Sequence, residues 1–73
     1  MAYEVWEMES GNLVATFGRE DDALALVHDA VQTHGEEYGR RLALVREDES
    51  GHTTTLATAD QLLERVRGLT ARH

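Results

Sequence analysis

The chain has 73 residues, and its composition excludes the usual covalent and thiolate-metal supports of so small a fold. It contains no cysteine, so neither a disulfide nor a thiolate zinc site can hold it together. A domain of this size buries only about 60% of the surface that its unfolded chain exposes. We therefore expect one domain, residues 1–73, that depends on close packing or on association with a partner.

The net charge of −7 is distributed unequally along the chain. Residues 1–37 carry nine acidic residues and one arginine, a net charge of −8, whereas residues 38–73 carry five acidic residues and six arginines. Lysine is absent. An acidic balance argues against a nonspecific nucleic-acid binder, because such binding depends on a positive field. It would suit an acidic surface presented to a basic partner.

No run of about 18 apolar residues is present, and the N-terminus lacks the basic and apolar regions of a signal peptide. We expect no membrane association and a cytoplasmic location.

The first elements in chain order form a predicted β-hairpin. Residues 3–8 are rich in aromatic and β-branched residues, and residues 9–12 supply turn chemistry. In the second strand, residues 13–17, alternation places Leu13 on the same face as Phe17 and Val14 on the opposite face.

A helix is predicted over residues 20–34. Three carboxylates occupy its first turn, where the helix dipole favours negative charge. Apolar residues follow at helical spacing, and Gly35 is a natural residue to end the helix.

The second half repeats this order. Residues 36–40 are expected to be a connector in which Gly39 permits a sharp redirection. Residues 41–46 are apolar at consecutive positions, as in a central strand, and residues 52–56 form a polar strand at an edge. Thr58 and Gln61 form a capping box before a second helix with Leu62, Leu63 and Val66.

The predicted fold class is α+β: the order ββαββα, with a four-stranded, mainly antiparallel sheet and two helices on one face. Residues 9–11 and 49–51 both read Glu-Ser-Gly, which suggests two ββα units over about 1–37 and 38–73. Coincidence between two hairpin turns explains the same similarity.

Residues able to carry chemistry are few. The four histidines, His28, His34, His52 and His73, lack the spacing of a helical metal site. Ser10 and Ser50 lie in turn sequences outside any nucleophile motif. We expect no enzyme, no catalytic residue, no metal and no cofactor.

Two surfaces are candidates for binding. Trp6 and Met8 share one face of the first strand, and Tyr3 and Val5 share the other. Whichever pair the helices leave uncovered forms a partly apolar interface. The alternative is a nucleic-acid-associated regulator that uses a patch of Arg40, Arg41 and Arg46.

The run from Tyr3 to Phe17, followed by an acidic helix start with Ala23 and Leu24, resembles small stand-alone bacterial proteins without an assigned activity. The resemblance implies a free-standing ββαββα protein and no catalytic residue. Composition and pattern together favour a non-enzymatic interaction or regulatory module, homodimeric and also bound to an unidentified protein, with an antitoxin-like role by analogy. A dimer that binds a ligand in a cleft between its subunits is a third hypothesis.

Overall fold

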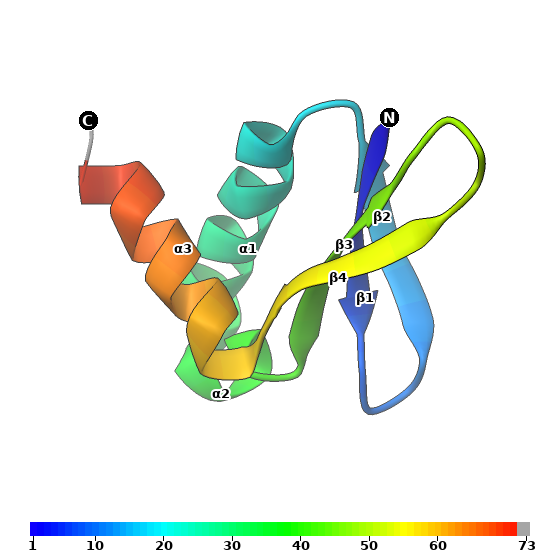
Figure 1. Ribbon diagram of the computed structural model, residues 1–73. Coiled ribbons are helices and arrows are strands. Elements are labelled where there is room, and N and C mark those ends of the chain that lie inside the picture. The colour runs from blue at the N-terminus through cyan, green and yellow to red at the C-terminus, as the bar shows by residue number, and fades with distance from the viewer. Residues whose placement is uncertain (72–73) are drawn as a thin grey trace.

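The computed structural model describes residues 1–71, and its secondary structure has the predicted order with one added helix (Figure 1). The elements are β1 (Ala2–Glu7), β2 (Asn12–Phe17), α1 (Glu20–His34), α2 (Glu36–Gly39), β3 (Leu42–Glu47), β4 (Thr53–Thr58) and α3 (Ala59–Ala71). The α+β class and the ββαββα order are therefore confirmed. Each strand begins or ends within one or two residues of its predicted limits.

The four strands form one antiparallel sheet in the order β2-β1-β3-β4. Strands β1 and β3 are central, and Val5 of β1 lies opposite Leu44 of β3. The consecutive apolar residues of β3 and the threonines of β4 thus occupy the central and edge positions that their polarity predicts. Each edge strand pairs with its neighbour through one irregularity in register.

Helices α1 and α3 lie side by side on the same side of the sheet (Figure 1). The core fills the space between this helix layer and the sheet. Its fully buried members come from both layers: Val5, Ala23, Val27, Leu42, Leu44 and Leu62. The molecule consequently has two layers, and its shortest dimension is 17 Å.

Helix α1 spans the residues that its sequence predicts. Glu20, Asp21 and Asp22 lie in its first turn, where carboxylates interact favourably with the helix dipole. The helix ends at Gly35, whose φ of 93° is disfavoured for other residues and whose N–H donates to the carbonyl of Val31.

The expected connector at residues 36–40 is instead a one-turn helix, α2, and the role assigned to Gly39 was wrong. Gly39 does not have the positive φ that favours glycine. It is buried against α1 and α3, and a Cβ at this position would lie 2.6 Å from Cγ2 of Val31 and 3.0 Å from Cδ2 of Leu63. Close packing, and not a change of chain direction, requires glycine here.

The start of α3 also differs from its prediction. Ala59 has a φ of 49°, a left-handed conformation that is uncommon outside glycine. No hydrogen bond joins Thr58 to Gln61 within the described chain, so the predicted capping box is not formed. The chain instead turns sharply from β4 into α3 at Ala59 (Figure 1).

The two hairpin turns share a polar design. In the first, the carboxylate of Glu7 accepts hydrogen bonds from the backbone N–H and the hydroxyl of Ser10. In the second, Asp48 accepts the same pair of bonds from Ser50. Each turn thereby satisfies its backbone with a local carboxylate.

Candidate functional site: the open face of the sheet

Within residues 1–71, one face of the sheet carries no helix, and we call it the open face (Figure 1). The strand register assigns residues to it, because cross-strand partners share a face. The core residue Val5 points toward the helices, so its neighbours along β1 point away from them. The open face is formed by Ala2, Glu4, Trp6, Leu13, Thr16, Ala43, Val45, Glu47, Thr53, Thr55 and Thr58.

A row of mainly apolar side chains crosses this face. Trp6 has Leu13 as its partner on β2 and Ala43 as its partner on β3. Ala43 is buried although no helix covers it, which places it under the neighbouring side chains of the row. Leu13 remains 45% exposed, so the row ends in an apolar group open to solvent.

The position of Leu13 corrects the alternation drawn from the sequence. Ala15 pairs with Val5, whereas Leu13 pairs with Trp6, so the register shifts between these two pairs. The shift leaves Val14 as the extra residue of a β-bulge and moves Leu13 to the face opposite Phe17. Without the bulge, Leu13 would point toward the helices.

Carboxylates accompany the apolar row. Glu4 accepts a hydrogen bond of 3.0 Å from Nε1 of Trp6, two residues further along the same strand, which holds the indole along β1. Glu47 lies diagonally from Glu4 on β3, because the partner of Glu4 is Val45. The edge strands β2 and β4 contain no charged residue. The described open face thus carries negative charge and no positive charge.

Of the four predicted interface residues, the structure leaves two available. Val5 is fully buried in the core, and Tyr3 packs against it, so neither belongs to an uncovered face. Trp6 lies on the open face, and Met8, just beyond β1, is 45% exposed. The sequence could not choose between the two pairs, because both are large and apolar.

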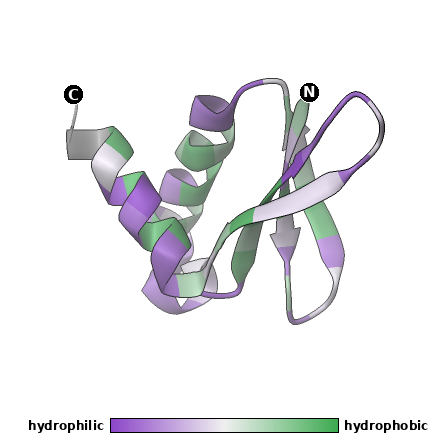
Figure 2. Ribbon diagram, viewed as in Figure 1, coloured by the Kyte–Doolittle hydropathy of each residue, from purple (hydrophilic) through white to green (hydrophobic). Residues whose placement is uncertain are grey.

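The edge strands differ in character. Figure 2 shows β2 as largely hydrophobic and β4 as largely neutral. The large apolar side chains classed as exposed in the described chain are Met1, Met8, Leu13 and Val14. All four belong to the first hairpin and the residue before it, so the large exposed apolar side chains are concentrated at the half of the sheet formed by β1 and β2.

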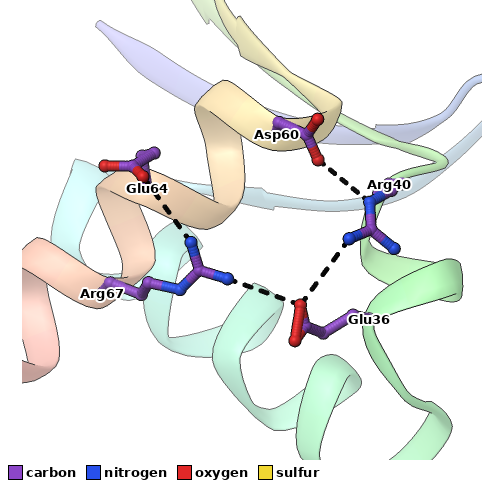
Figure 3. A network of polar contacts seen from close by, with 5 residues as sticks. All are labelled: Glu36, Arg40, Asp60, Glu64 and Arg67. Atoms are coloured by element: carbon purple, nitrogen blue, oxygen red, sulfur yellow. Dashed lines mark hydrogen bonds and ion pairs between the residues drawn. The ribbon is translucent and has the colours of Figure 1, made fainter.

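Arg40, from the predicted basic patch, is engaged in a network of ion pairs (Figure 3). Its guanidinium lies 2.9 Å from Asp60 at the start of α3 and 3.8 Å from Glu36. Arg67 also contacts Glu36, at 3.4 Å, so that carboxylate connects two arginines. The hydrogen bond and charge of Asp60 raise the pKa of Arg40.

Arg41 is held in a second cluster, at the end of β1. Its guanidinium lies 3.3 Å from Glu9 and 4.0 Å from Glu7, and it stacks over the ring of Tyr38 at 5.3 Å. Hydrogen bonds from Ser10, aided by the charge of Arg41, lower the pKa of Glu7. These contacts connect the first turn to the residue that precedes β3.

The three arginines do not form a continuous patch. Arg46 lies opposite Tyr3 on the helix side of β3, five residues from Arg41 and therefore about 16 Å along the strand. Arg40 and Arg41 precede the other end of β3 and already contact carboxylates. A polyanion would have to compete with these internal partners for the guanidinium groups.

A small groove lies on the helix layer. Val31 of α1 and Leu63 and Val66 of α3 line it together with polar residues that include His28, and its volume is about 230 Å³. The ring of His34 lies 5.0 Å from that of Tyr38. The described residues contain no cluster of three potential metal ligands, and His73 lies outside them.

Comparisons with protein-family models, with curated proteins and with solved structures find no match to this chain. None of the described helices has the length and apolarity needed to cross a membrane.

Proposed function

We propose that this protein is a non-enzymatic interaction module that binds another protein surface through the open face of its sheet. The observation that carries the proposal is the apolar row of Trp6 and Leu13, which lies outside the core and on the face without helices. Leu13 is exposed and Trp6 beside it is half-buried, and apolar groups that meet on a solvent-facing surface of a small protein are typical of binding surfaces. Aromatic residues are enriched at such interfaces.

The arrangement of the polar groups supports binding over catalysis. The hydroxyl of Ser10 donates to Glu7, and no histidine is among its described hydrogen-bond partners. Arg40 and Arg41 are engaged with carboxylates from neighbouring elements. These contacts stabilise turns and connect elements, whereas a catalytic group must remain available to a substrate.

Self-association through the open face is one form of this proposal, and binding of a different protein is the other. Either form would increase the stability of a domain with so small a core, because a partner buries apolar area that one copy leaves exposed. Both forms require the same row of side chains.

The test compares the wild type with Leu13→Thr, which removes an exposed apolar group while retaining strand propensity. The control is Val31→Thr, which makes the same kind of polar exchange at a half-buried position of the groove on the helix layer. We expect sedimentation or affinity capture from the source cell to reveal a complex that Leu13→Thr weakens and Val31→Thr retains. Thermal unfolding checks that each variant is folded. Identical behaviour of the three proteins would refute the open face as the contact surface.

A further inference from the structure

Resting on the proposed function, we infer that the open face binds a cationic amphipathic segment of a different protein, and not a second copy of this chain. The inference follows from which charges the face carries and how they are arranged beside the apolar row. The strand register determines both which charged residues lie on this face and how they are arranged.

The charge on the open face has one sign. Glu4 and Glu47 are its charged residues within the described chain, and they occupy diagonal positions on β1 and β3. Diagonal neighbours in an antiparallel pair lie about 7–8 Å apart. No described ion pair engages either carboxylate. Each of the two carboxylates can therefore form an ion pair with a different arginine or lysine side chain of a partner.

The apolar and acidic groups follow one another along the strands. The row of Trp6 comes first, the row of Glu4 follows two residues along β1, and the row of Glu47 lies two residues further. Successive rows are about 6.6 Å apart, since a strand rises about 3.3 Å per residue. Positions i and i+4 of a helix lie about 6 Å apart. A helix with an apolar anchor and basic residues about four and eight positions along therefore matches the face.

Within residues 1–71, the arginines of a second copy lie outside its own open face. Arg65 pairs with Glu20, and Arg67 with Glu36, both on the helix layer. Arg46 lies on the helix side of the sheet, and Arg19 follows the end of β2. Packing two open faces together would bring carboxylates against carboxylates without an intervening cation, and such like-charge contacts disfavour association.

The experiment uses the fluorescence of Trp6, the single tryptophan of the chain. The probe is a tryptophan-free helical peptide of about 18 residues, with a leucine anchor and arginines about four and eight positions along. A peptide of the same composition in scrambled order is the peptide control. We expect the ordered peptide to shift the Trp6 emission and bind more tightly than the scrambled one. Binding should weaken as ionic strength rises.

Charge variants separate the open face from the general acidity of the protein. Glu4→Gln combined with Glu47→Gln removes both carboxylates of the face, and we expect binding to weaken about tenfold. Asp29→Asn combined with Glu37→Gln removes the same charge from the helix layer and should bind as the wild type does. Circular dichroism confirms that both double variants retain the fold.

Any of three results with the peptides would overturn the inference: equal weakening by both double variants, equal binding of the ordered and scrambled peptides, or an unchanged Trp6 emission at saturation. A dimer at micromolar concentration that depends on Leu13 would also overturn it, with a second copy as the occupant. That last result would leave the proposed function standing. Absence of any Leu13-dependent complex, with self, peptide or cellular partner, would remove the proposed function as well.

Discussion

At the scale of single residues, two positions determine where neighbouring residues lie. Gly39 lets α2 approach α1 and α3 to a distance at which no side chain fits. Val14, as the bulge residue, turns Leu13 from the core side to the open face. Neither effect depends on what the residue itself binds. Both act through the geometry that they impose on their neighbours.

Replacement of Gly39 by alanine should reduce the free energy of unfolding by about 1–3 kcal/mol, because the new methyl group must displace Val31 and Leu63. Gly68→Ala is the matched control. Gly68 lies within α3 with open space around it, so alanine should stabilise that helix by up to about 1 kcal/mol. Urea denaturation of the two variants measures both changes. A loss of stability in both would contradict the packing role of Gly39.

The face on which each residue of the first hairpin lies could be predicted from the sequence only in part. Period-two alternation assigned the faces of β1 correctly, since Val5 and Trp6 point in opposite directions. It failed in β2 because a bulge adds one residue and reverses the alternation beyond it. Nothing in the local sequence around Val14 distinguishes a bulge from a regular strand. The bulge becomes visible only in the pairing with β1.

At the scale of elements, the helices and strands follow from local signals, whereas their contacts do not. Helix α1 was predictable from its acidic first turn, its apolar spacing and Gly35. The ion pairs between α2 and α3 depend on how the two helices are placed, which no local pattern of Arg40 or Asp60 reveals. The choice of covered face likewise depends on both helices together.

The hairpin turns give a prediction about acid stability. The pKa of Glu7 is lowered from its ordinary value of 4.5, and that of Asp48 from 3.8, in both cases chiefly by the hydroxyl of the turn serine. A carboxyl whose pKa is lower in the folded state stabilises the fold above its ordinary pKa. This stabilisation is lost as the pH falls through the folded value.

We therefore expect the free energy of unfolding to decrease on acidification below about pH 4.5. Glu7→Gln should reduce stability at neutral pH and flatten this decrease. Ser10→Ala retains the carboxylate but removes one of its donors, so it should give an intermediate slope. Denaturant titrations at a series of pH values measure the slopes. A slope in Glu7→Gln as steep as in the wild type would show that Glu7 is not responsible.

At the scale of the whole molecule, a single core connects all layers. Leu44 of β3 is fully buried, and its strand partners Val5 and Ala57 belong to the same cluster as residues of both helices. A chain of 73 residues has a total stability of only about 4–11 kcal/mol. One large core side chain therefore contributes a substantial part of it.

Leu44→Ala should cost about 2–5 kcal/mol, enough to populate the unfolded state markedly at room temperature. Val45→Thr, at the next position but on the open face, should cost less than about 1 kcal/mol because the site is only half-buried. Thermal and urea unfolding measure the difference. Equal losses at the two positions would contradict the assignment of an inner and an open face to β3.

The order β2-β1-β3-β4 has a consequence for how the chain folds. The ladder between β1 and β3 joins Ala2 to Glu47 and Glu7 to Leu42, residues that are far apart in the sequence. Each ββα half supplies an edge strand, a central strand and one long helix that packs on those strands, and the two halves meet through the ladder between β1 and β3 and the contact between α1 and α3. The chain between β1 and β3 must bring its two ends together before this ladder can form, and the closure costs conformational entropy. The halves therefore acquire stability together, as one cooperative unit.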